Sequence, residues 1–207
     1  MVEAGYNLMS ARGYADTTMA EIAEMAGVAV QTVYFTFRNK PGLLRAVWEF
    51  AVLGDHEPGT PVARPWFRAL EQEPELETAL GLALDGSLAI HQRVAPLASV
   101  FETFSADPEI REFERLDRQL KLDGYSRMLD VLVQKRDLRA GVARDDAVIV
   151  LTGLLSGDTY RAMVVRLGWE PPKWREWTIR TLADGLFAAA QPPGTGQHPP
   201  GPVPGRP

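Results

Sequence analysis

The chain has 207 residues, of which 45% are hydrophobic, so it can bury a substantial core, and intrinsic disorder of the whole chain is excluded. It contains no cysteine, which excludes disulfide frameworks, thiolate zinc sites and cysteine nucleophiles. A net charge of −5 argues against a partner that must be held by a large positive field, so composition alone does not suggest nucleic acid.

The sequence contains neither a membrane span nor an export signal that we can recognise. Its longest nearly unbroken apolar stretch, residues 147–157, is about half of the roughly 20 residues that a spanning helix needs. The start of the chain lacks the cationic region and apolar centre of an export signal. We therefore expect a cytoplasmic protein with no membrane partner.

The most informative segment is 17–40. Thr18 stands before an apolar-periodic run and Glu21 follows three residues later, which is the spacing of a capping box. A helix is therefore predicted to begin at Met19. Gly27 stands where a residue with positive φ is needed to leave that helix.

A second helix is predicted over about 30–37, with Val33 turned inward. Ala23 of the first helix is small, as two short helices that cross at a steep angle require. This pattern is typical of a helix-turn-helix, whose second helix enters the major groove of DNA. An ordinary corner between two core helices remains the alternative.

A set of residues within 4–47 matches a known family in register. These residues are Gly13-Tyr14, Thr17-Thr18, Ile22-Ala23, Ala26-Gly27-Val28, Thr32-Val33-Tyr34, Phe37, Lys40 and Leu43-Leu44. With them the segment resembles the DNA-binding domain of the TetR (tetracycline-repressor) family of bacterial transcription regulators. Gly168-Trp169, before the last helix, is similar to many actinobacterial members of that family.

The resemblance implies which side chains contact double-stranded operator DNA. They are Val30, Gln31, Thr32 and Thr36 in the groove and Thr18, Tyr34 and Lys40 at phosphates. Gln31 can pair with a base edge, commonly adenine. A partly buried Tyr34, a solvated Lys40 and a merely exposed Gln31 remain alternatives.

Three features of residues 1–53 depart from the family pattern. Four cationic residues stand against five acidic ones, so this domain has a formal charge of −1, and we expect weak non-specific DNA binding. Ala29 stands where Ser or Thr commonly caps the second helix, and the loss of such a cap costs about 1 kcal/mol. The chain also opens almost inside its first helix, which leaves a truncated start open as an alternative.

Composition divides the rest of the chain. Residues 54–65 contain three prolines and two glycines and are predicted to form a linker after the DNA-binding domain. Residues 66–190 are predicted to form a larger helical domain for ligand binding and dimerisation. Of the seventeen residues in 191–207, eleven are Pro or Gly, so this tail is expected to be disordered.

Helical periodicity dominates the larger domain. Helices are predicted over about 75–95, 97–105, 109–135, 145–167 and 174–190. No alternating hydrophobic run of strand type is present. The predicted fold class is therefore all-α, with an N-terminal three-helix helix-turn-helix domain and about nine helices in total.

The resemblance implies two jobs for this larger domain. The last two helices would form a four-helix homodimer interface, for which the candidates are Val148, Leu151, Leu155, Trp177, Leu182 and Leu186. The middle helices would enclose a small-molecule effector, for which the candidates are His91, Phe101, Phe104, Tyr125 and Met128. For both sets, ordinary packing within one chain remains the alternative.

The sequence thus predicts a ligand-responsive transcriptional regulator, a repressor that leaves a palindromic operator when a small molecule binds. The alternative is a helical small-molecule-binding protein with little or no DNA affinity. An enzyme is not expected, because the three histidines lie far apart and no HExxH, GxSxG or glycine-rich phosphate loop is present. We expect no catalytic residue, metal site or cofactor.

Overall fold

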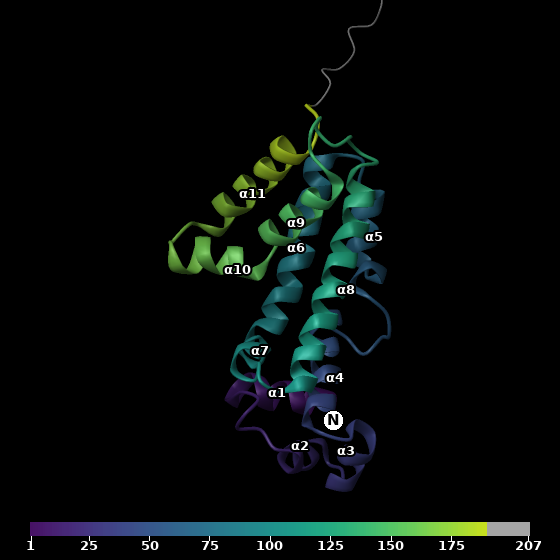
Figure 1. Cartoon of the computed structure of the whole chain (residues 1–207), viewed down its shortest axis with the longest axis vertical. Helices are drawn as coiled ribbons and strands as arrows, with labels where there is room; N and C mark the ends of the chain where they lie inside the picture. The colour runs from purple at the N-terminus through teal and green to yellow at the C-terminus, as the bar shows by residue number, and fades with distance from the viewer. Residues whose placement is uncertain (190–207) are drawn as a thin grey trace, which may run out of the picture.

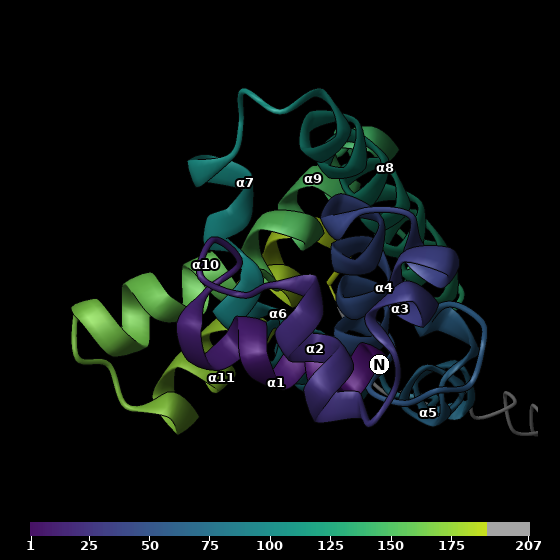
Figure 2. The ribbon, with the colours of Figure 1, turned by 90° about the horizontal axis from the view of Figure 1, so that it is seen from below.

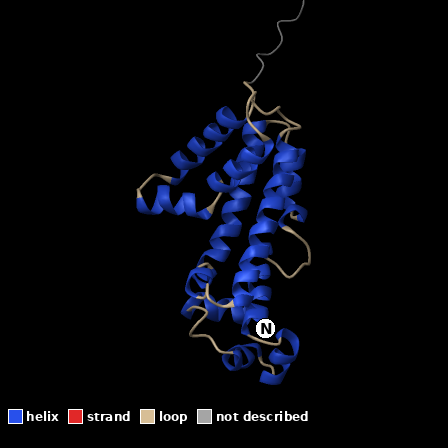
Figure 3. Cartoon of the chain, in the orientation of Figure 1, coloured by secondary structure: helices blue, strands red, loops and turns tan. Residues whose placement is uncertain are grey.

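The computed structural model describes residues 1–189, and within them it confirms the all-α fold class (Figure 3). Eleven α-helices are present in this part of the chain, more than the roughly nine expected, because several connections form short helices of their own. The helices are α1 Val2–Arg12, α2 Met19–Ala26, α3 Val30–Phe37, α4 Lys40–Leu53, α5 Pro65–Gln72, α6 Leu76–Val94, α7 Ser99–Thr103, α8 Pro108–Leu132, α9 Arg144–Leu154, α10 Gly157–Tyr160 and α11 Pro171–Leu186. Two short 3₁₀ turns, η1 Pro61–Ala63 and η2 Ala95–Leu97, and one π-helical stretch, η3 Arg161–Arg166, complete the helical elements.

The single helix predicted over 145–167 is wrong. The chain leaves α9 after Leu154, and the side chain of Ser156 accepts a hydrogen bond of 3.1 Å from the backbone N–H of Thr159. A serine in this position starts a new helix because it satisfies a free N–H group. The result is the separate short α10, followed by η3.

The last helix begins earlier than predicted. Pro171 and Pro172 occupy its first two positions, where the missing N–H is not needed, so they start the helix and do not lie ahead of it. It ends at Leu186, because Phe187 is extended and forms an isolated antiparallel bridge with Leu138. The predicted tail 191–207 lies outside the described residues.

The two long helices α6 and α8 run side by side along the molecule, with α5, α9 and α11 around one end (Figure 1). Helices α1 to α3 lie at the opposite end, which faces the viewer in Figure 2. Buried side chains form two clusters. One lies among α5, α6, α8, α9 and α11, and the other joins α1 to α4 to η2, α7 and the start of α8.

Helix α4 is therefore shared between the N-terminal helices and the long helices. Its last turn is held by Arg93 of α6, whose guanidinium donates to the carbonyls of Ala51 at 2.7 Å and Val52 at 3.0 Å. The hydroxyl of Tyr6 in α1 donates to the carbonyl of Arg93 at 3.0 Å. Arg93 thus joins three helices by charge-assisted and neutral hydrogen bonds.

The segment predicted to be a linker, residues 54–65, is a loop that is held by contacts of its own side chains. Gly54 ends α4 with a φ of 82°, a conformation that favours glycine. The buried Arg64 pairs with Asp55 at 2.8 Å and donates to the carbonyl of Glu57 at 2.6 Å. Val62 of η1 packs against the buried cluster, and η1 contacts α5 and α8, so the loop lies against the helices.

No single helix among residues 1–189 is long and apolar enough to cross a membrane, although α9 and the bent segment that follows it pass that test together. In the same residues, no three His, Asp or Glu side chains gather as a metal site would require.

Substitution of Gly86 tests the packing of α5 against α6. A Cβ at Gly86 would lie 2.4 Å from the ring of Trp66, so Gly86→Ala should lower the free energy of unfolding by about 1 to 3 kcal/mol. Gly124→Ala in α8 is the matched control, because nothing lies within 4 Å of its Cβ and alanine favours a helix by roughly 0.5 to 1 kcal/mol. Urea unfolding of both variants checks this, and equal stabilisation of the two would contradict the packing described.

Candidate functional site

The helix-turn-helix predicted from the sequence is present with its predicted start and turn. The Thr18 side chain accepts from the backbone N–H of Glu21, and the Glu21 side chain accepts from the backbone N–H of Thr18, so the capping box is complete. Gly27 has a φ of 67° and ends α2. Helix α3 begins at Val30 without a side-chain cap, as expected from Ala29.

Helix α3 packs through its fully buried Val33 and the partly buried Val30 and Phe37, and leaves most of its surface open. Val33 is fully buried and Val30 half-buried against the neighbouring helices. The other predicted groove residues all point to solvent, namely Gln31, Thr32 and Thr36. The Thr36 hydroxyl donates to the carbonyl of Thr32 at 2.9 Å, so within this pair its proton is engaged along the helix.

An acidic side chain occupies the start of α2, where a phosphate contact is predicted. Both the backbone N–H and the hydroxyl of Thr18 donate to a Glu21 carboxylate oxygen at 2.8 Å. Arg12 contacts the other oxygen at 3.0 Å. Hydrogen bonds from Thr18 and the charge of Arg12 hold the pKa of Glu21 below its ordinary value. Thr18 and Arg12 are therefore already engaged with a carboxylate.

The two remaining predicted phosphate contacts differ in their freedom. The side chain of Tyr34 is 49% exposed. Lys40 is fixed, because its ammonium donates to the carbonyl of Ala15 at 3.1 Å and lies 4.3 Å from the ring centre of Tyr14. Partial burial lowers the pKa of Lys40. These contacts hold its charge beside the start of α4.

One exposed residue of α3 was missed by the sequence analysis. Phe35 is 90% exposed, more than any other large hydrophobic side chain in the described part of the chain. The signal was available in the spacing, because Phe35 lies one helical turn after Gln31 and two residues after the buried Val33. An apolar side chain in a short amphipathic helix is easily taken for core.

A cavity of about 500 Å³ lies between α4, α5, α6, α8 and the loop that contains η1. Three of the predicted ligand residues line it, namely His91, Tyr125 and Met128. The other two do not. Phe101 packs against Trp48 at a ring distance of 4.8 Å, and Phe104 packs against Tyr14 at 5.0 Å, so both help to join the N-terminal helices to α7.

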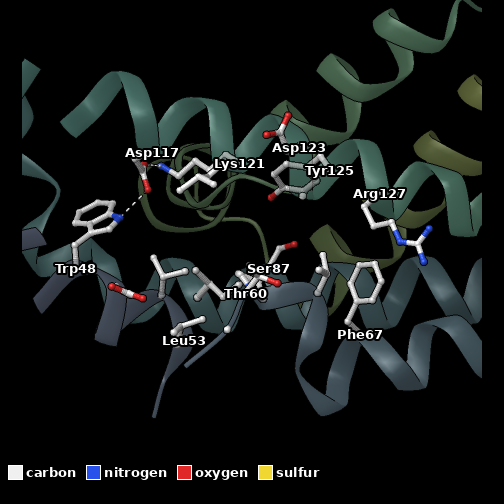
Figure 4. Close-up of a pocket in the computed structure, with 18 of the residues that line it drawn as sticks. Trp48, Leu53, Thr60, Phe67, Ser87, Asp117, Lys121, Asp123, Tyr125 and Arg127 are labelled. Carbon is white, nitrogen blue, oxygen red and sulfur yellow. Dashed lines mark hydrogen bonds and ion pairs between the residues drawn. The ribbon is translucent and has the colours of Figure 1, made fainter. Parts of the chain in front are cut away.

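Polar contacts at one end of the cavity involve residues that the sequence analysis did not select (Figure 4). The indole N–H of Trp48 in α4 donates to Asp117 of α8 at 2.8 Å, and the Lys121 ammonium contacts the other Asp117 oxygen at 2.6 Å. Asp117 is buried, and the two donors offset its desolvation. The cavity wall is thereby bonded to the helix that follows α3.

The imidazole of His91 is an uncharged group of this wall. Burial and the charges of Lys121 and Arg161 lower its pKa to about 4, against opposing effects of Asp158 and Asp117. Its Cβ also approaches Gly157, where an added methyl group would lie 2.8 Å away. Burial likewise raises the pKa of the Tyr125 phenol, opposed by its hydrogen bond with Ser87. The His91 imidazole and the Tyr125 phenol are therefore neutral at pH 7.

Most of the predicted dimer residues are buried in the core of the described chain. Only Trp177 is half-buried, and it packs edge-on against Trp169. The other five are buried within the described chain: Val148, Leu151, Leu155, Leu182 and Leu186. The apolar stripe that they form packs inside the described chain, in the buried cluster that also contains side chains of α6 and α8, and their place between two chains stays a prediction. The exposed apolar residues of α9 are Ile149 and Val150, at 63% and 38%.

Comparison with known proteins agrees with this architecture. Residues 1–47 match the family described as bacterial regulatory proteins, tetR family. The chain is 24% identical over 169 residues to the HTH-type transcriptional regulator AcrR of Shigella flexneri, which covers 76% of this chain and 74% of that protein.

Solved structures share the fold. FadR from Bacillus subtilis, in complex with stearoyl-CoA, has a TM-score of 0.67 and 16% identity over 90% of this chain and 97% of that one. NalD, the secondary repressor of the MexAB-OprM multidrug efflux pump in Pseudomonas aeruginosa, has a TM-score of 0.63 and 19% identity over 90% and 93%. A helix-turn-helix at one end of a helical body is thus the arrangement of a known class of regulators.

The depressed pKa of His91 predicts how stability depends on pH. The unfolded chain binds this proton below its ordinary pKa of 6.5 and the folded chain only near 4, so stability falls as pH falls through that window. Between pH 7 and pH 5 the loss should be about 2 kcal/mol. Urea unfolding of the protein and of His91→Gln at both pH values isolates the effect, and parallel losses in the two proteins would refute it.

Proposed function

We propose that this chain is a cytoplasmic, homodimeric transcriptional regulator of the TetR family, which represses by binding operator DNA and leaves it when a small molecule fills the cavity. The observation that carries the proposal is the matched helix-turn-helix over residues 1–47, with the polar side of α3 turned to solvent. The body adds a cavity of the size that drug-like ligands occupy. Gly168-Trp169 supports the actinobacterial subtype.

In this proposal residues 1–53 read DNA and residues 66–190 bind the effector and the second subunit. Helix α4 transmits occupancy of the cavity, because it starts directly after α3 and carries Trp48 on the cavity wall. We call residues 1–53 of each subunit its reading head. A ligand that binds more tightly to one position of α4 shifts the spacing of the two reading heads. A difference in binding energy of about 1 to 3 kcal/mol is typical of such coupling.

The dimer places two α3 helices on successive major-groove turns, about 34 Å apart. We assign its surface to the outer faces of α9 and α11. On α9 this face contains Ile149, and one turn later Gly153, beside which nothing lies within 4 Å. On α11 it contains the half-buried Trp177. A face of apolar and small residues allows two helix pairs to approach closely.

A second candidate is a helical ligand-binding protein with little DNA affinity. It is favoured by the formal charge of −1 on residues 1–53 and by the engagement of Thr18 with Glu21. A gel-shift assay with the intergenic DNA beside the gene, repeated at several salt concentrations, separates the two. Binding that weakens steeply with salt supports the regulator. No shift at low salt, also with an N-terminally extended chain, supports the second candidate.

Substitutions in the reading head should separate two kinds of contact. Tyr34→Phe should weaken binding to all sequences by about fivefold, because it removes one donor to phosphate. Lys40→Ala should also weaken binding to all sequences. It should reduce by about 1 the slope of the logarithm of the binding constant against the logarithm of salt concentration. Gln31→Ala should instead relax preference at one base pair, by about 1 to 3 kcal/mol. Binding to a panel of operator variants measures this, and uniform losses for all three variants would show that Gln31 reads no base.

A charge on α9 should disrupt the proposed dimer. Ile149→Asp places an unpaired carboxylate in the surface between subunits and should weaken dimerisation by more than about 30-fold. Met25→Asp is the matched control, since Met25 is 53% exposed but lies on α2. Sedimentation equilibrium gives the dissociation constants. A dimeric Ile149→Asp protein would reject this face.

A further inference from the structure

Phe35 is the side chain for which neither the fold nor the proposed phosphate contacts supplies a role. It is 90% exposed on α3, whereas Val33 on the same helix is fully buried. Successive residues of a helix turn by about 100°, so Phe35 points almost opposite to Val33, and Gln31 lies one turn away on the same side. The outward face of α3 is therefore centred on Gln31 and Phe35.

The other phenylalanines of the chain are packed. Five of them take part in close ring contacts, and the remaining two, Phe37 and Phe187, are half-buried and buried. Within residues 1–189, Phe35 has no comparable ring contact. Exposure of so large an apolar side chain does not stabilise the monomer. Its place at the centre of the outward face of α3 puts the ring where a helix bound in the major groove would meet the base edges.

The chemistry of a DNA groove restricts what this ring can contact. A phenyl group has no hydrogen-bond donor, so it cannot hold a phosphate as Tyr34 or Lys40 would. In the major groove the bases offer hydrogen-bonding edges and one apolar group, the C5 methyl of thymine. Gln31 and Phe35 are about 6 Å apart along the helix, so they would reach base pairs within about two steps of each other.

We propose that Phe35 is a specificity-determining residue that reads a thymine by packing on its C5 methyl group, beside the base read by Gln31. This inference rests on the proposed function, because it requires α3 to enter the major groove. It predicts an operator half-site in which loss of the methyl group weakens binding while the base pairing is unchanged.

The test compares the same intergenic fragment prepared with thymine or with uracil, which lacks only the methyl group. The protein should bind the uracil fragment about fivefold more weakly. Phe35→Ala should lose about as much affinity for the thymine fragment and bind both fragments equally. Phe35→Leu, which keeps an apolar side chain, should retain a preference for thymine. Gln31→Ala is the control, and it should retain the full preference.

The outcomes separate the role of Phe35 from the proposed function as a DNA-binding regulator. Equal binding of the two fragments by the unaltered protein overturns the role of Phe35 and leaves the regulator intact. A thymine preference that survives in Phe35→Ala also overturns it, because the methyl group is then read elsewhere or acts through the shape of the DNA. Failure to bind the thymine fragment at all overturns both the inference and the regulator. Circular dichroism of each variant verifies that the helix content of the chain is unchanged.

Discussion

One buried contact, the hydrogen bond from the Trp48 indole to Asp117, ties the N-terminal helices to the cavity. It joins α4, which follows the reading helix directly, to α8, which forms a wall of the cavity. Because Asp117 is charged and buried, loss of either of its donors leaves an unbalanced carboxylate. In the proposed regulator, the position of α4 is therefore coupled to a ligand that disturbs that end of the cavity. One turn further along α4, Arg93 holds its last turn by hydrogen bonds to the carbonyls of Ala51 and Val52.

The reading head could be predicted from sequence because local chemistry determines it. Thr18 and Gly27 specify where α2 begins and ends with few alternatives. The proposed dimer face could not be predicted from sequence, because an apolar stripe on α9 has the same periodicity whether it packs inside one chain or between two. Leu151 fills the core, whereas Ile149 remains exposed. The break at Ser156 was missed because an apolar run can contain a helix cap without a change of hydrophobicity.

The electrostatics of the head favour selective over indiscriminate binding. Four cations against five carboxylates provide little general attraction to phosphate, and Glu21 occupies the Thr18 donors. In the proposed dimer, affinity for an operator would then come to a larger extent from base edges and from the second subunit. The outward pair of an amide and a phenyl ring on α3 fits that requirement. Such a regulator should release weakly matched DNA readily.

The distance between residues 1–53 of the two subunits in the proposed dimer tests the proposed coupling of α4 to the cavity most directly. The chain has no cysteine, so a nitroxide label on Met25→Cys, an exposed position on α2, reports a single distance by pulsed electron spin resonance. We predict one distribution of distances between the labels of the two subunits. This distribution should become narrower on addition of the intergenic DNA, because the two α3 helices must then lie about 34 Å apart. The distribution should become broader in Asp117→Ala, because this substitution removes the acceptor of the Trp48 hydrogen bond. No distance between subunits, or a distribution that neither DNA nor Asp117→Ala changes, would contradict the account.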